Sequence, residues 1–152
     1  MTVHEQTSGT NYGSAAVLEA GGPAGRRART FLRVAVTGMG TRPATAANLH
    51  LQVVSAVGAA SPSGGRIHVV TSCTWNETTM TWDTQPVMDV GVLSTVGSVA
   101  RGQAVDFDVT GAITRGDGVY CFAIESTFNN PVMYNSRESA GPRPSLTVTV
   151  AP

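Results

Sequence analysis

The sequence contains no lysine, only two cysteines and little charge of either sign. Charged residues make up 13% of its 152 residues, and the formal net charge is zero. This excludes a non-specific binder of nucleic acid or of an anionic membrane surface, because both need an excess of basic residues. No segment approaches the roughly 20 apolar residues that span a bilayer. Residues 1–5 lack the layout of a signal peptide, so we expect any export signal to lie upstream in a longer protein.

Long uninterrupted helical windows are also missing. Seventeen glycines and eight prolines are spread through the chain, and the segments between them alternate apolar and polar residues. A period of two is typical of strands with one buried face. The alternation is clearest at 32–36, 47–53, 105–109 and 146–150. Weaker strands are predicted at 3–6, 15–20, 66–74, 79–83, 91–99, 119–126 and 131–136.

About nine to eleven short strands without a helical crossover predict an all-β fold, an antiparallel β-sandwich of the jelly-roll type. A chain of 152 residues fits one domain, which we place at residues 1–152.

The two cysteines, Cys73 and Cys121, permit one disulfide. In the strand predicted at 66–74, Cys73 is expected to point inward with Ile67 and Val69. Cys121 lies on the opposite face from the bulky Phe122. Opposite faces cannot be bridged without a bulge or a backbone shift, so two free thiols are favoured over a disulfide.

Catalytic motifs are absent: there is no nucleophile elbow, no zinc-spaced ligand cluster and no phosphate-binding glycine loop. Asp106 and Asp108 share a strand face, with carboxylates about 7 Å apart, a spacing that overlaps that of inverting glycosidases. Their regular strand context favours an ordinary surface pair. His4, His50 and His68 are scattered and are interpreted as solvated strand residues. We therefore predict that the domain is not an enzyme.

Five short motifs follow one another along the chain. They are Asn11-Tyr12-Gly13, Phe31-Leu32-Arg33-Val34, Trp75-Asn76-Glu77 with Thr81-Trp82 and Pro86, Asp108-Val109-Thr110, and Ser136-Arg137-Glu138 ahead of Pro144. In this order, over nearly the whole chain, they resemble the DNRLRE domain family. The resemblance implies a jelly-roll carbohydrate-binding module, secreted or at the cell surface. Such modules are covalently linked to disaggregatase-type or polysaccharide-cleaving enzymes, or lie in large bacterial and archaeal surface or toxin proteins.

Most of the motif residues are assigned structural roles. Trp75 shares a face with Ile67 and Val69, so it is predicted to be a core anchor, with a sugar platform as the alternative. Asp108 and Thr110 are predicted to cap the turn after their strand. Adjacent residues of a strand point to opposite faces, so Arg137 and Glu138 are predicted not to pair with each other. The structural set is Trp75, Glu77, Asp108, Thr110, Arg137 and Glu138.

Sugars pack on aromatic faces and bond to planar polar side chains. The aromatics left outside the predicted core are Tyr12, Phe31, Trp82, Phe128 and Tyr134, of which Trp82 is alternatively a second core or edge residue. Three arginines in a glycine-bracketed loop could pair with uronate carboxylates, or form only a solvated basic loop. The candidate ligand-binding residues are Asn11, Tyr12, Arg26, Arg27, Arg29, Trp82, Phe128, Asn130, Tyr134 and Asn135. No cofactor is required, and a structural calcium ion is an option for loop oxygens.

The function predicted from the sequence is a non-catalytic module that targets an attached enzyme or surface protein to a polysaccharide, with an acidic glycan as one option. The alternative is a structural or adhesive spacer without a small ligand.

Overall fold

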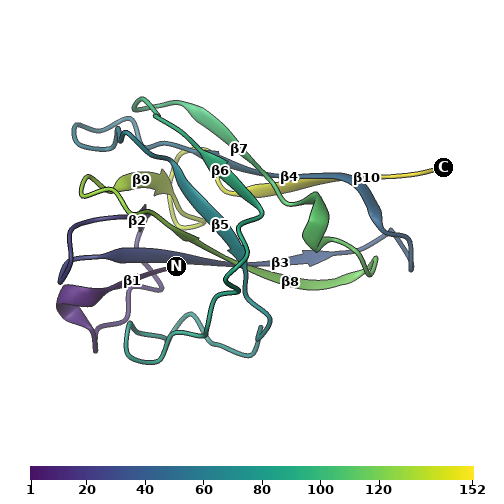
Figure 1. Ribbon diagram of the computed structural model, residues 1–152, viewed down its shortest axis with the longest axis horizontal. Coiled ribbons are helices and arrows are strands. Elements are labelled where there is room, and N and C mark those ends of the chain that lie inside the picture. Colours follow the sequence, from purple (N-terminus) through teal and green to yellow (C-terminus); the bar gives the residue numbers. More distant parts are fainter.

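The alternating segments form the strands of a two-layered molecule (Figure 1). The computed structural model describes residues 1–152 and has ten strands, within the predicted range. These are β1 (Thr2–His4), β2 (Val17–Ala20), β3 (Ala28–Val36), β4 (Ala44–Gln52), β5 (Gly65–Val69), β6 (Ser94–Val96), β7 (Ala104–Asp108), β8 (Gly118–Glu125), β9 (Val132–Asn135) and β10 (Ser145–Val150). Two 3-10 turns, η1 (Glu5–Thr7) and η2 (Thr110–Ala112), are the only helical elements, and neither could cross a membrane.

The strands pair antiparallel throughout, which confirms the predicted β-sandwich. The larger sheet has the order β1-β3-β8-β5-β6, and a smaller sheet has the order β10-β4-β7. The pair β2-β9 joins the layer of β4 through a bridge between Val53 and Tyr134. In Figure 1, β3 and β8 run beneath β4, β7 and β10.

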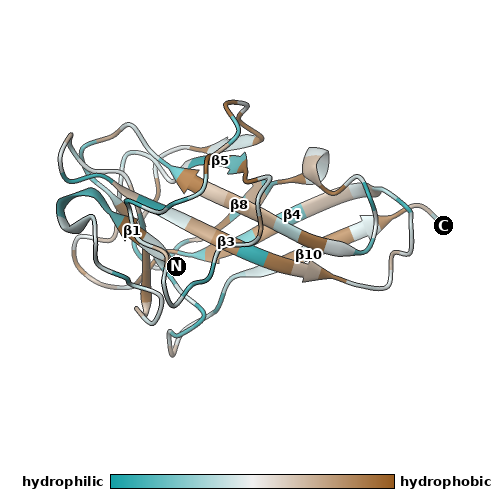
Figure 2. Cartoon of the chain, turned by 90° about the horizontal axis from the view of Figure 1, so that it is seen from below, coloured by the Kyte–Doolittle hydropathy of each residue, from teal (hydrophilic) through white to brown (hydrophobic).

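Side chains from both layers form a main core of 20 buried residues. Leu49 of β4 lies between Leu146 of β10 and Phe107 of β7 in the strand register. Leu49 and Phe107 are fully buried, whereas Leu146 is partly buried at the edge. Hydropathy colouring shows the alternation of apolar and polar residues along β3 (Figure 2). The period-two pattern therefore predicted the inward faces of these strands correctly.

Strand β8 differs from the others because both of its faces are buried. Tyr120, Phe122 and Ile124 point into the main core. Cys121 and Ala123 point outward, into a second cluster that also contains Val3, Phe31, Val70 and Met80. The connection between β5 and β6, residues 70–93, supplies Val70 and Met80 and also packs Cys73, Trp75, Trp82 and Met88 against this cluster. We call residues 70–93 the covering segment.

The prediction of free thiols is wrong: Cys73 and Cys121 form a disulfide, with their Cα atoms 5.7 Å apart. Strand β5 ends at Val69, so the alternation of faces on which the prediction rested does not reach Cys73. The covering segment returns across the outer face of the larger sheet, and Cys121 points to that same face.

Two aromatic residues predicted to lie outside the core are fully buried, Phe31 in the second cluster and Tyr134 in the main core. The Tyr134 hydroxyl donates a hydrogen bond to the carbonyl oxygen of Gly64 at 2.7 Å. Burial raises the pKa of Tyr134. These positions remove both aromatic rings from the set of sugar contacts.

His68 was predicted to be solvated but is buried beneath the covering segment. Its Nδ1 lies 2.8 Å from the carbonyl oxygen of Asp89, and its Nε2 lies 3.0 Å from Oε1 of Glu125. Arg66 donates to the same Glu125 oxygen. The predicted strand at 79–83 is also wrong, since this part of the covering segment forms turns.

The two cysteines are 48 residues apart in the sequence. For a loop of this length, the loss of chain entropy in the unfolded state predicts that the disulfide stabilises the fold by about 4 kcal/mol. We expect the double variant Cys73→Ala/Cys121→Ala to lose up to that amount of unfolding free energy, measured by urea denaturation. A non-reducing mass measurement that finds two free thiols in the folded wild-type protein would contradict the disulfide.

Replacing Tyr134 by Phe removes the hydroxyl that satisfies the buried Gly64 carbonyl. We expect a loss of about 1–2 kcal/mol in unfolding free energy. Tyr12→Phe is the matched control, because the Tyr12 hydroxyl bonds only to Thr7 at the surface; it should change stability by less than about 0.5 kcal/mol. Equal effects of the two substitutions in thermal denaturation would contradict the buried role of Tyr134.

Candidate functional site

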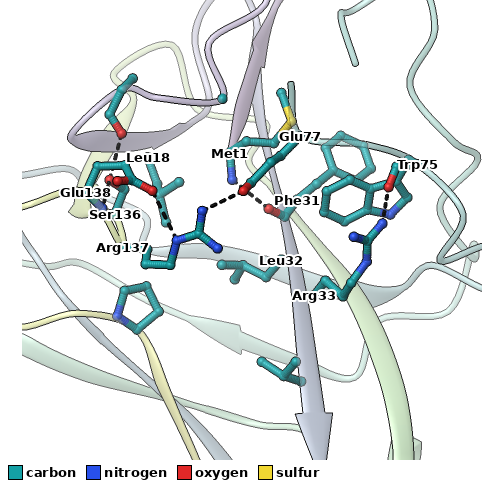
Figure 3. Close-up of a pocket in the computed structure, with 14 residues that line it drawn as sticks. Met1, Leu18, Phe31, Leu32, Arg33, Trp75, Glu77, Ser136, Arg137 and Glu138 are labelled. Atoms are coloured by element: carbon teal, nitrogen blue, oxygen red, sulfur yellow. Dashed lines mark hydrogen bonds and ion pairs between the residues drawn. The ribbon is translucent and has the colours of Figure 1, made fainter. Parts of the chain in front are cut away.

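Residues of several motifs meet in one pocket at the edge of β3 (Figure 3). Strand β1 pairs with β3 only at residues 28–30, so the rest of this β3 edge has no neighbouring strand. A pocket of about 220 Å³ opens there. We call it the motif pocket; the residues that carry its chemistry are Leu32, Arg33, Trp75, Glu77, Arg137 and Glu138.

Arg137 spans the pocket between two carboxylates, as Figure 3 shows. Its Nη2 donates to Oε1 of Glu77 at 2.5 Å, and its Nε donates to Oε1 of Glu138 at 3.0 Å. The hydrogen bonds to both carboxylates raise the pKa of Arg137. The prediction that Arg137 and Glu138 do not pair is wrong, because β9 ends at Asn135 and the two residues lie in a turn.

Arg33 and Trp75 form the other side of the pocket. The guanidinium carbon of Arg33 lies 4.3 Å from the centre of the Trp75 ring, and Arg33 donates to the carbonyl oxygens of Cys73 and Trp75. Phe31 meets the indole edge to face at 6.3 Å between ring centres. Trp75 is therefore only partly buried, between the core and the pocket. Arg33 was not among the residues predicted to bind a ligand, although it is the one charged residue of the Phe31-Leu32-Arg33-Val34 motif.

The first motif positions the segment that carries Glu77. Asn11 donates from Nδ2 to the carbonyl oxygens of Glu77 and Met80, at 2.8 and 2.7 Å, and its Oδ1 accepts from the Gly13 backbone. A Cβ atom on Gly13 would lie 1.9 Å from the Glu77 carbonyl oxygen, so only glycine permits this approach. The candidate Asn11 thus supports the pocket from behind, while the Tyr12 ring packs edge-on against His4.

Several other candidates gather on a second surface, formed by the β2–β3 loop, β3 and the covering segment. The guanidinium carbons of Arg29 and Arg27 lie 4.8 and 5.8 Å from the centre of the Trp82 ring. Arg26 is exposed in the same loop. We call Arg26, Arg27, Arg29 and Trp82 the arginine surface; its loop lies at the end of the sandwich opposite the C-terminus (Figure 1).

The arginines of this surface differ in their partners. Arg27 donates from Nη2 and Nε to the two carboxylate oxygens of Glu5, at 2.6 and 2.9 Å. These hydrogen bonds lower the pKa of Glu5 to about 2, so Glu5 neutralises Arg27 at ordinary pH. Arg29 has no carboxylate partner and donates to the amide oxygen of Gln85 at 2.9 Å. Its partial burial lowers the pKa of the guanidinium, because desolvation disfavours the cation.

The β8–β9 turn adjoins the arginine surface. The backbone N–H of Gly22 donates to the Phe128 carbonyl oxygen at 2.9 Å, and the Phe128 ring is 47% exposed. A hollow of about 240 Å³ runs between this turn and the arginines. Asn130 lies apart, donating to the Ala60 carbonyl oxygen at 3.3 Å, and Asn135 is buried beside Gly141.

The remaining polar motif forms a turn. Asp108 accepts from the backbone N–H and the hydroxyl of Thr110, which confirms the predicted cap, and these bonds lower the pKa of Asp108. Asp106 pairs with His50 instead of acting with Asp108. No three His, Cys, Asp or Glu side chains converge as metal ligands.

The sequence model of one family, described as carbohydrate-binding module family 96, matches residues 1–150. No curated protein sequence matches the chain. The match supports the general inference of a carbohydrate-binding module, a class that is in general non-catalytic, whereas the resemblance to the DNRLRE family stays a prediction. The match covers nearly all of the sandwich and every motif that forms the pocket; the chain belongs to carbohydrate-binding module family 96.

Proposed function

We propose that this carbohydrate-binding module binds an acidic polysaccharide at the arginine surface and holds a covalently attached enzyme or surface protein on it. The observation that carries the proposal is Arg29, a partly buried guanidinium that forms no ion pair with a carboxylate of the protein. Its guanidinium carbon lies over the Trp82 ring, 4.8 Å from the ring centre.

An anionic ligand would give the Arg29 guanidinium the ion-pair partner that it lacks within the protein. Burial disfavours an unpaired cation, and a uronate carboxylate can accept two parallel hydrogen bonds from a guanidinium. Arg26 adds a second exposed charge in the neighbouring loop. Phe128 offers an exposed ring in the neighbouring β8–β9 turn, against which the C–H face of a sugar can pack. The surface therefore combines charge and apolar contact in the way that an acidic glycan requires.

The benefit to an attached protein is an increase in effective concentration. When the module is bound to the polysaccharide, the attached protein is tethered to the same polymer, and its further contacts with that polymer become intramolecular. We propose a secreted or cell-surface location, which the disulfide supports because such bonds persist in oxidising environments.

Affinity electrophoresis tests the acidic ligand. We expect the mobility of the wild-type protein to fall in gels that contain polygalacturonate, more than in gels with a neutral glucan. Arg29→Gln should weaken retention at least tenfold, since a hydrogen bond to a charged group contributes about 1.5–3 kcal/mol. Arg101→Gln, at an exposed turn elsewhere, is the matched control and should leave retention unchanged.

Retention should also fall as salt rises, because the Debye length is about 10 Å at 0.1 M ionic strength. A wild-type protein that no acidic polysaccharide retains at low salt would contradict the proposal. Unchanged melting temperature with every glycan tested would favour the alternative function, a structural spacer.

A variant of Glu5 provides the opposite change. Glu5 is ionised above a pKa of about 2 and neutralises Arg27. We expect Glu5→Gln to free Arg27 for the ligand and to strengthen retention on polygalacturonate by about two- to tenfold, because the substitution removes the carboxylate that neutralises Arg27. Glu138→Gln is the control at the motif pocket and should have no such effect. Weaker retention by a fully folded Glu5→Gln protein would contradict the role given to Arg27.

A further inference from the structure

The motif pocket lies outside the arginine surface, and the two hollows share no lining residue. We propose that the motif pocket is a second sugar site, which holds one uncharged pyranose residue at a chain end or a side branch. This inference rests on the proposed function in one respect, that the ligand of the domain is a carbohydrate.

The size of the pocket limits the ligand to a single ring. Its volume of about 220 Å³ lies below the roughly 300–1,000 Å³ of cavities that accept drug-sized molecules. Apolar side chains also line the pocket, among them Leu18, Leu32, Val34 and Pro144. Apolar groups suit the C–H faces of a sugar ring. Because a pocket of this size holds one ring, we assign it a terminal residue or a side branch instead of the middle of a long chain.

The charges around the pocket balance. Arg33 and Arg137 carry two positive charges, and Glu77 and Glu138 carry two negative charges. The pocket therefore carries no net charge and gives an anionic sugar no electrostatic advantage over a neutral one.

The pocket contains both hydrogen-bond donors and hydrogen-bond acceptors that no group of the protein uses. Arg137 uses its Nε and Nη2 atoms, which leaves Nη1 as a donor. Glu77 and Glu138 each use Oε1 for Arg137, which leaves their Oε2 atoms as acceptors. A sugar hydroxyl both donates and accepts, so hydroxyls match this set better than a carboxylate, which only accepts.

Trp75 provides an independent observation. It lines the pocket, and its indole Nε1 is buried without any hydrogen-bond acceptor in the protein. A buried donor without a partner costs about 1–3 kcal/mol, so such groups are uncommon and require an explanation. The atom is shielded from water as well as unpaired, so a ligand hydroxyl can accept from this N–H only if neighbouring side chains move on binding. The face of the indole ring is in contact with Arg33.

The chain has only two tryptophans, Trp75 and Trp82, and one belongs to each site. Two-dimensional ¹H–¹⁵N spectra therefore report both sites through two indole signals, which a Trp82→Phe variant assigns. The probes are the methyl glycosides of glucose, galactose and mannose, the methyl glycosides of glucuronic and galacturonic acid, and an oligogalacturonate. We expect at least one neutral glycoside to shift the Trp75 signal and leave the Trp82 signal in place.

Two variants test the pocket residues. Arg137→Met keeps the aliphatic stem but removes the donors, and Glu138→Ala changes a side chain that is 40% exposed, so it should not affect folding. Each should raise the dissociation constant of the neutral glycoside at least tenfold, whereas Arg101→Met should leave it unchanged. Retained binding of oligogalacturonate at the Trp82 signal shows that the variants are folded.

The outcomes separate the two proposals. If oligogalacturonate shifts the Trp82 signal but no neutral glycoside shifts that of Trp75, the second site is wrong and the proposed function stands. If uronic acid glycosides shift the Trp75 signal more strongly than neutral ones, the neutral specificity is wrong. A neutral glycoside that binds Arg137→Met and Glu138→Ala as tightly as it binds the wild-type protein would also contradict the second sugar site. Binding of the neutral glycoside alone would support the pocket and contradict the acidic ligand.

Discussion

The burial of both faces of β8 is the constraint on which both candidate sites depend. Its outward residues, Cys121 and Ala123, need a cover, and the covering segment supplies one through the disulfide and the second cluster. In crossing the larger sheet, this segment brings Trp75 and Glu77 to the free edge of β3. The same segment places Trp82 against Arg29 further along that strand. A requirement of packing thus positions the aromatic residues used for recognition.

The sandwich itself was predictable from the sequence, since residues such as Leu49 and Phe107 alternate with polar neighbours on strands buried on one face. The path of the covering segment was not predictable, because the segment is irregular. Alternate residues point to opposite faces only within a strand, so the sequence pattern does not tell which way its side chains point. That is why the environments of Cys73 and Trp75 were misjudged. The run Tyr120-Cys121-Phe122-Ala123-Ile124 did contain a usable signal, because a continuous apolar segment is typical of a strand buried on both faces.

The candidate sites were predictable only in part. Three arginines within four positions were visible as a basic loop, and the structure adds that Glu5 neutralises one of them while Trp82 and Gln85 position another. The motif pocket was hidden because its ion pair joins Glu77 to Arg137, 60 residues apart in sequence. Local spacing cannot reveal contacts of this range. The order of the motifs indicated a family resemblance and a fold, but not that these residues meet in one pocket.

The disulfide also has a consequence for how the protein matures. Both tryptophans lie in the covering segment, and one covalent bond ties that segment to β8. The main core lies on the other side of the larger sheet, and none of its 20 buried residues belongs to the covering segment. A newly made chain can therefore bury its main core before its thiols are oxidised. Oxidation then adds a covalent tie between β8 and the segment that carries both tryptophans.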